Sequence, residues 1–209
     1  YINQCYSMTE LAGYGLLNVT QEGDHLRALG KPDGFCEVKV DETGEICVRG
    51  GCVMLGYYKD PEVTAETIDK DGWLHTGDLA RRDENGYYKI TGRIKDMIIR
   101  GGENIYPKEI EDFIYTHPKV SDVQVIGVPD KQYGEEIMAC VVLKPGEAMT
   151  EDELKDYVAS HMAKHKVPRY VDFVDSFPMN AAGKILKYKM REQAVEKLNL
   201  QSANSIETA

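Results

Sequence analysis

Short apolar runs separated by glycine-containing turns fill the first 92 residues of the chain. Segments 45–49 (Glu-Ile-Cys-Val-Arg) and 87–90 (Tyr-Tyr-Lys-Ile) have the length and composition of strands, and turn residues stand at 41–44, 71–72 and 84–86. Strand-length runs bounded by such turns predict a small, mostly antiparallel β unit. A short helix is expected to start at Asp60, because Pro61 suits the first turn of a helix.

The pattern changes near residue 96, where helical periodicity appears between strand-like runs. Pro107 begins a predicted helix that carries Ile110 and Ile114 on one face, together with Phe113. Apolar runs at 120–128 and 137–143 predict strands, and Thr150 with Glu153 forms a capping box that opens a second helix. A strand at 170–174 and a helix from about residue 187 follow. Strands mixed with helices in this way predict a compact α+β domain.

The predicted fold class is therefore α+β, with a small antiparallel β-rich subdomain, a distorted barrel, followed by a compact α+β domain. We place the first over residues 1–94 and the second over residues 95–200, with a polar tail at 201–209. The boundary falls in segment 92–96 (Gly-Arg-Ile-Lys-Asp), where charged residues interrupt two apolar strands. The last residues are polar, and we expect them to fray.

Composition narrows the class of protein. The chain has 209 residues, of which 42% are apolar and 29% charged, and this supports a packed core. No apolar run approaches the roughly 20 residues that cross a bilayer, so we expect no transmembrane segment. The chain starts with Tyr1 inside what reads as a domain, which suggests a fragment. A net charge of −10 argues against a general nucleic-acid binder, so local groups must hold any phosphate.

Cysteine and histidine usage gives no clear metal or disulfide pattern. The five cysteines are scattered without a CxxC pair, which argues against a disulfide framework and a zinc site. Cys47 and Cys52 are close in sequence, but no histidine follows at ligand spacing. We therefore expect free thiols in a reducing cytoplasm. His161 and His165 lie one turn apart on a predicted helix, where a solvated face is favoured over a metal site.

Three local patterns are candidates for chemistry. Thr9 and Glu10 offer hard oxygen ligands of the kind that Mg²⁺ uses beside substrate phosphates, although a simple turn also explains them. Asp78 follows a glycine, where a carboxylate can accept hydrogen bonds from a ribose diol or form an Asx-turn. Lys184 follows Gly183 on a loop; it lacks the Ser or Thr of a triphosphate-binding loop, and on its own it reads as a surface lysine.

Five ordered segments resemble the adenylate-forming superfamily, which includes acyl-CoA synthetases, coumarate ligases, luciferases and peptide-synthetase adenylation domains. The order of the segments over nearly the whole chain makes the resemblance specific. One departure is Ser7, where the family usually has glycine. The segments are 6–10 (Tyr-Ser-Met-Thr-Glu), 44–50 (Gly-Glu-Ile-Cys-Val-Arg-Gly) continuing to 56–58 (Gly-Tyr-Tyr), 72–78 (Gly-Trp-Leu-His-Thr-Gly-Asp), 92–96 (Gly-Arg-Ile-Lys-Asp) with 101–105 (Gly-Gly-Glu-Asn-Ile), and 178–184 (Pro-Met-Asn-Ala-Ala-Gly-Lys).

The resemblance implies a role for each of these segments. Lys184 would bridge the carboxylate and the α-phosphate during adenylation, and Lys95 would be the hinge about which the second domain swings. Trp73, the only tryptophan, is expected in the core, and Lys187 and Lys189 on the surface. The remaining implied roles are Tyr6 in the adenine site, Thr9 at the α-phosphate, Glu10 at Mg²⁺, Asp78 at the ribose hydroxyls, Arg93 on the ribose-phosphate side, and Gly101, Gly102 and Glu103 in the pantetheine tunnel.

The implied activity is that of an AMP-forming acyl-CoA ligase of the EC 6.2.1 type. A fatty or aryl carboxylic acid and ATP would give acyl-AMP, and coenzyme A would then displace AMP, with Mg²⁺ as the metal. The triphosphate loop and most of the acyl pocket would lie in an N-terminal portion outside this sequence. A peptide-synthetase-like adenylation domain is one alternative. A non-catalytic nucleotide- or CoA-binding fragment is the other.

Overall fold

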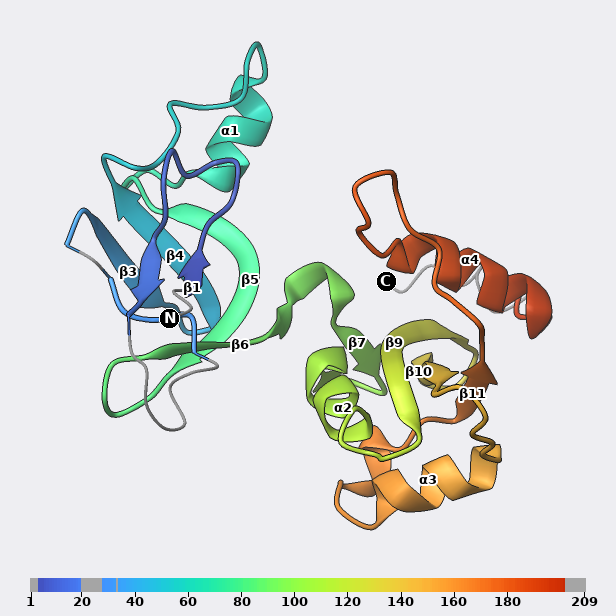
Figure 1. The fold of residues 1–209 in the computed structure, drawn as a ribbon. Helices are drawn as coiled ribbons and strands as arrows, with labels where there is room; N and C mark the ends of the chain where they lie inside the picture. Colours follow the sequence, from blue (N-terminus) through green and yellow to red (C-terminus); the bar gives the residue numbers. More distant parts are fainter. Residues whose placement is uncertain (1–3, 20–27, 33, 202–209) are drawn as a thin grey trace. The chain divides into compact units, whose positions relative to one another are not determined.

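The structure is a computed structural model, and the residues that it describes are 4–19, 28–32 and 34–201 (Figure 1). The chain forms two compact units, Tyr1–Lys95 and Asp96–Ala209. The division lies next to the predicted boundary between residues 94 and 95. A short 3-10 turn, Ile94–Asp96, carries the chain from one unit to the next. Each unit has its own apolar core.

The first unit is built on a four-stranded antiparallel sheet in the order β3-β4-β5-β6. Its strongly curved strand β5 gives the unit the shape of a half-barrel (Figure 1). A separate two-stranded pair, β1-β2, completes the β structure of the unit. The bounds are β1 Gln4–Tyr6, β2 Leu16–Asn18, β3 Cys36–Val40, β4 Glu45–Gly50, β5 Leu74–Arg82 and β6 Tyr88–Arg93.

The core of this unit lies between the sheet and the β1-β2 pair. Leu16, Ile46 and Leu74 are fully buried there, beside the ring of Tyr88. The one α-helix described in the unit, α1 (Pro61–Thr67), starts where the sequence predicts it to start. The Asp60 side chain accepts a hydrogen bond from the backbone N–H of Val63 at 3.1 Å and caps that helix.

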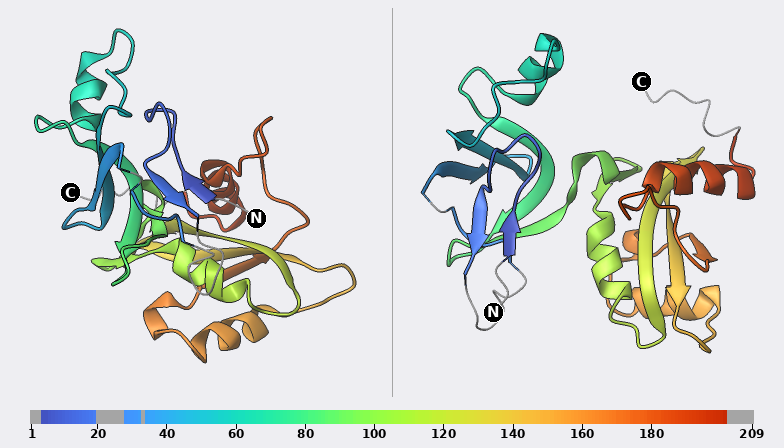
Figure 2. Two further views of the ribbon diagram at one scale, coloured as in Figure 1. Left: turned by 60° about the vertical axis from the view of Figure 1, so that its left-hand side comes forward. Right: turned by 45° about the horizontal axis from the view of Figure 1, so that its top comes forward.

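The second unit is a mixed five-stranded sheet covered by helices on both faces (Figure 2). Strand β10 is central: it pairs antiparallel with β9 and β7 and parallel with β11. The predicted α+β class is confirmed. The bounds are β7 Ile98–Arg100, β8 Glu103–Ile105, α2 Pro107–Ile114, β9 Val120–Asp130, β10 Gly134–Leu143, α3 Glu151–Ala159, β11 Tyr170–Phe173 and α4 Lys187–Lys197.

Alternation along β10 explains the helices on both faces. Ile137, Ala139 and Val141 belong to the core cluster that contains residues of α2 and α3. Met138 and Cys140 belong to the cluster on the other side, with residues of α4. Successive strand residues point to opposite faces, so a run that is apolar at every position needs cover on both. Among the described helices, none has the length and apolar character to cross a bilayer.

Several expectations from the sequence are wrong in detail. The helix that was to carry His161 and His165 ends at Ala159, and His165 lies in the 3-10 turn Lys164–Lys166. Trp73 is only half-buried and not in the core, and its ring lies against the cations of Lys39 and Arg49, at 4.2 and 4.5 Å from the centroid.

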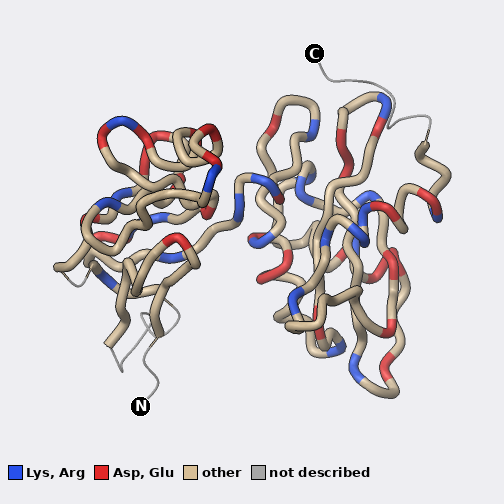
Figure 3. Tube along the Cα trace, turned by 90° about the horizontal axis from the view of Figure 1, so that it is seen from above, with Lys and Arg blue, Asp and Glu red and all other residues tan. Residues whose placement is uncertain are grey.

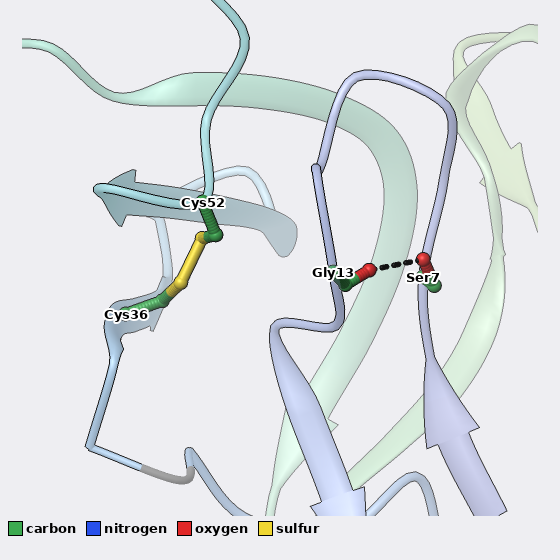
Figure 4. The surroundings of a disulfide bond; sticks show 4 residues. All are labelled: Ser7, Gly13, Cys36 and Cys52. Carbon is green, nitrogen blue, oxygen red and sulfur yellow. Dashed lines mark hydrogen bonds between the residues drawn. A yellow bond between two sulfur atoms is a disulfide. The ribbon is translucent and has the colours of Figure 1, made fainter.

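Cys36 and Cys52 are joined by a disulfide, contrary to the expectation of free thiols (Figure 4). Cys36 opposes Gly50 in the β3-β4 register, so the next turn brings Cys52 beside it, with the two Cα atoms 6.5 Å apart. That separation is within the range that disulfides span. Strand pairing sets this proximity, and the spacing of cysteines along the sequence does not show it.

Candidate functional site

Three predicted site residues meet in the first unit. The β5-β6 register places Asp78 opposite Arg93. The Tyr6 hydroxyl donates to Asp78 Oδ2 at 2.8 Å, and Arg93 Nε donates to Asp78 Oδ1 at 2.9 Å. Burial, together with the Asp78 carboxylate, raises the pKa of Tyr6, so its hydroxyl remains a donor. The Asp78 carboxylate is thus held from both sides, while the Arg93 side chain is 44% exposed.

Thr9 and Glu10 lie in the loop between β1 and β2. The Ser7 hydroxyl donates to the carbonyl oxygen of Gly13 and closes this loop (Figure 4). The Tyr57 hydroxyl donates to Glu10 Oε1 at 2.8 Å, and this bond raises the pKa of Tyr57. Thr9 is exposed and Glu10 is half-buried, so oxygen atoms of both are available at the surface of the unit. Carboxylate and hydroxyl oxygens fit the preference of Mg²⁺.

The side chain of Glu45, on the neighbouring strand β4, forms a hydrogen bond to the backbone next to Asp78. Glu45 Oε1 accepts the backbone N–H of Gly77 at 2.6 Å, and Oε2 lies 2.9 Å from His75 Nδ1. This hydrogen bond raises the pKa of His75 above its ordinary value. Sequence analysis assigned no role to Glu45 or to Tyr57. The sequence signal that could have identified them is their position in segments 44–50 and 56–58, which resemble the superfamily.

Cys47 and Asp41 complete a group of four potential metal ligands with Glu45 and His75. Their ligand atoms all lie within 4.8 Å of one another, although the sequence places no histidine near Cys47. Hydrogen bonds already occupy the group: Asp41 Oδ1 accepts the backbone N–H groups of Thr43 and Glu45, each at 2.9 Å. Burial and the Glu45 charge raise the pKa of the Cys47 thiol to about 11, which disfavours the thiolate a metal would need.

Lys184 stands on an exposed loop of the second unit, between β11 and α4. Asn180 shapes this loop, because its side-chain Oδ1 accepts the backbone N–H of Lys184 at 2.9 Å. Asn180 N in turn donates to the Lys184 carbonyl oxygen at 2.9 Å, and Gly183 takes the left-handed φ of 77° that the turn requires. The loop is therefore defined, and it presents the Lys184 side chain to solvent.

Lys187 does not have the exposed position that the sequence predicts, because its side chain is mostly buried. Its ammonium group donates to Glu111 Oε1 at 2.7 Å and to the Val125 carbonyl oxygen at 3.1 Å. Its side chain is 22% exposed and that of Glu111 only 12%. Lys187 therefore ties α4 to α2 and β9.

The Gly101-Gly102 segment forms the two-residue turn between β7 and β8. Both glycines have positive φ, 59° and 86°, as the tight hairpin turns that match strand twist require. Glu103 begins β8 and is exposed, and Lys95 is exposed in the 3-10 turn between the units. The turn is fixed at its base, because Gly101 N donates to the Tyr133 carbonyl oxygen at 2.8 Å.

Basic and acidic residues are interspersed over the trace of each unit (Figure 3). Each unit carries one basic residue that the sequence predicts to contact the nucleotide, Arg93 in the first unit and Lys184 in the second.

These features define a class of protein. A carboxylate held by a tyrosine and an arginine in a β-rich unit, followed by an α+β unit with a lysine on a glycine loop, is the arrangement that the resemblance to the adenylate-forming superfamily implies. Residues 109–184 match the family described as the AMP-binding enzyme C-terminal domain. The chain belongs to the adenylate-forming superfamily and corresponds to the C-terminal portion of its acyl-CoA synthetases.

Individual relatives support this assignment. The chain is 58% identical over 171 residues to the putative acyl-CoA synthetase YngI of Bacillus subtilis, covering 81% of this chain and 31% of that protein. It is 53% identical over 208 residues to the mitochondrial medium-chain acyl-CoA ligase ACSF2 of Bos taurus, covering 93% and 34%. The structure of ATP-bound MatB from Rhodopseudomonas palustris matches with a TM-score of 0.85 at 37% identity, covering 92% of this chain and 40% of MatB. The chain thus spans about a third of the length of the two curated relatives.

Proposed function

We propose that this chain is the C-terminal part of an AMP-forming acyl-CoA synthetase. A carboxylic acid and ATP give acyl-AMP and pyrophosphate, and the thiol of coenzyme A then displaces AMP to give acyl-CoA. The observation that carries the proposal is the Asp78 carboxylate, fixed between Tyr6 and Arg93 on a turn of the β-rich unit. The names of two relatives, the putative acyl-CoA synthetase YngI and the medium-chain acyl-CoA ligase ACSF2, support the choice of reaction.

The first unit supplies the groups that hold the nucleotide. Asp78 accepts hydrogen bonds from the two ribose hydroxyls, since each carboxylate oxygen has lone pairs beyond the one used by Tyr6 or Arg93. Arg93 uses one of its five N–H donors on Asp78 and has others for the phosphate side. The Tyr6 ring is proposed to line the adenine site, and its hydroxyl orients Asp78.

Thr9 and Glu10 serve the phosphates. The Thr9 hydroxyl donates to the α-phosphate, and Glu10, oriented by Tyr57, would hold Mg²⁺. The ion would offset the negative charge of the phosphates. Glu10 fits this role because one of its oxygens is fixed by a neutral donor, which leaves the carboxylate charge uncompensated.

The second unit brings the reactive groups. Lys184 offsets the repulsion between the substrate carboxylate and the α-phosphate as charge builds up in the transition state. We propose that the unit pivots at Lys95 between two reactions, so that Lys184 is presented for adenylation and the Gly101-Gly102 turn, with Glu103, for thioester formation. Glycine at that turn lets the backbone approach a thin pantetheine arm.

The substrate is proposed to be a fatty or aryl acid. The medium-chain name of ACSF2 favours the fatty class. The cytoplasm stays the proposed compartment. The expectation that all five cysteines are free thiols, which favoured a reducing compartment, does not hold for Cys36 and Cys52. The relative ACSF2 is named mitochondrial.

The direct test of the nucleotide site is replacement of Asp78 by Asn in the complete protein. Loss of a charged hydrogen-bond acceptor is expected to weaken AMP binding by about tenfold to a hundredfold. Calorimetric titration with AMP measures the change. Asp71→Asn, the same replacement on an exposed loop aspartate, is the matched control and should bind AMP like the parent. Equal affinity of parent and Asp78→Asn would rule out the ribose site.

A further inference from the structure

The pairing between β4 and β5 is interrupted next to Asp78, which keeps its pairing with Arg93 of β6 on the other side of the strand. Glu45 pairs with Leu79, and Cys47 pairs with His75. Segment 76–78 of β5 therefore stands opposite Ile46 alone, which makes this a bulge with additional residues on β5. Bulges of this kind re-aim a side chain next to a functional site, and they leave backbone groups without ladder partners.

Side chains satisfy the groups that the bulge frees. The Thr76 hydroxyl donates to the Ile46 carbonyl oxygen at 2.8 Å, and it accepts the backbone N–H of Asp78 at 3.2 Å. Glu45 Oε1 accepts the Gly77 N–H at 2.6 Å, in place of the strand carbonyl that would otherwise do so. Gly77 has a φ of 73°, and an added Cβ there would meet nothing within 4 Å. The backbone conformation of the bulge, not lack of space, therefore requires glycine at this position.

His75 and Asp41 in turn hold Glu45 in place. Its side chain is only 9% exposed, and Oε2 lies 2.9 Å from His75 Nδ1, on the residue that precedes the bulge. Asp41 fixes the Glu45 backbone N–H at 2.9 Å from the β3-β4 turn. A buried carboxylate is costly unless both of its oxygens are satisfied. Here the two oxygens of Glu45 bind different residues: Oε2 contacts the side chain of His75, and Oε1 accepts the backbone N–H of Gly77. The carboxylate therefore bridges the residue before the bulge and the middle of the bulge.

We propose that Glu45, held by His75, is a positioning residue for nucleotide binding: it fixes the Gly77 bulge and thereby sets the position of the Asp78 carboxylate. The inference rests on the proposed function, because it takes Asp78 to be the ribose ligand. Misplacement of a binding group by about 1 Å can cost a large factor in rate or affinity, so the bulge is a place where a residue without substrate contact affects binding.

Two replacements of Glu45 show whether AMP binding depends on its hydrogen-bond acceptor or on its negative charge. Glu45→Gln keeps an oxygen that can accept the Gly77 N–H, whereas Glu45→Met has similar length and no acceptor. In the complete protein, AMP affinity is expected to fall about tenfold in Glu45→Met, the size of one lost hydrogen bond at the site, and less than about threefold in Glu45→Gln. Glu37→Met is the matched control in the same sheet, because Glu37 is an exposed carboxylate that pairs with Arg49; its AMP affinity should match that of the parent.

A double-mutant cycle with Asp78→Asn distinguishes positioning from general damage to the unit. If Glu45 acts through Asp78, Glu45→Met should have no further effect on AMP affinity once Asp78 is Asn. A loss by the same factor in both backgrounds, or no loss in the parent background, overturns the inference and leaves the nucleotide site intact. An Asp78→Asn protein that binds AMP like the parent overturns the proposed site and this inference together. If Glu45→Met does not fold, Glu45→Asp, whose carboxylate is too short to reach Gly77, takes its place in the same cycle.

Discussion

Replacing Lys184 by alanine in the complete protein is expected to slow acyl-adenylate formation by about 10²- to 10³-fold, the scale of losing one transition-state charge stabiliser. Attack of coenzyme A on supplied acyl-AMP should remain largely unchanged. The reason is that the two reactions make different demands on charge. Adenylation brings a carboxylate to an anionic phosphate, whereas thioester formation starts from an acyl-AMP in which that repulsion has already been overcome.

The two half-reactions can be measured separately, by acid-dependent ATP–pyrophosphate exchange and by thioester formation from synthetic acyl-AMP. Lys189→Ala is the matched control, because Lys189 is an exposed lysine on the nearby helix α4. It should leave both rates close to those of the parent. An equal loss of both half-reactions in Lys184→Ala would show that Lys184 is not specific to adenylation.

Replacing Arg100 by methionine is expected to lower the free energy of unfolding by about 3–5 kcal/mol, because it leaves a buried carboxylate without its cation. Glu136 is 2% exposed in its side chain, and it accepts Arg100 Nε at 2.8 Å and Nη2 at 2.7 Å. The nearest remaining cation, Arg169 Nη1, is 3.7 Å away. The pair ties β7, which leads into the Gly101-Gly102 turn, to the central strand β10.

Chemical denaturation measures this effect, and two further variants make it specific. Arg100→Met combined with Glu136→Leu should recover most of the loss, because an apolar pair can replace a buried ion pair. Lys166→Met, which removes a partly exposed pair with Glu109, should cost less than about 1 kcal/mol. If Arg100→Met costs no more than Lys166→Met, the Glu136 carboxylate does not depend on Arg100.

Elements determined by local sequence could be predicted. The capping box is present as expected: Thr150 N donates to Glu153 Oε2 at 2.8 Å, and Glu153 N donates to Thr150 Oγ1 at 3.2 Å. Pro107 occupies the first turn of α2, and Ile110 and Ile114 are fully buried. In each case the signal lies within a few residues of its structural consequence, so no knowledge of the fold is needed to interpret it.

Features that depend on contacts between distant segments could not be predicted. The Tyr6–Asp78 hydrogen bond joins residues 72 positions apart, and the Lys187–Glu111 bond joins residues 76 apart. The disulfide Cys36–Cys52 and the proximity of His75 to Cys47 follow from strand register, which single-residue patterns do not fix. The residues of the candidate site are therefore predicted by the resemblance of segments, while the contacts that hold them, such as those of Glu45 and Tyr57, are visible only in the structure.

The central claim is that a substrate carboxylate oxygen becomes bonded to the α-phosphorus of ATP. Turnover of the complete protein with a medium-chain fatty acid labelled with ¹⁸O in its carboxylate, in the presence of ATP and coenzyme A, tests this directly by mass spectrometry of the products. The account predicts AMP that carries one ¹⁸O atom from the acid. Label in inorganic phosphate, or AMP without label while acyl-CoA forms, would contradict it.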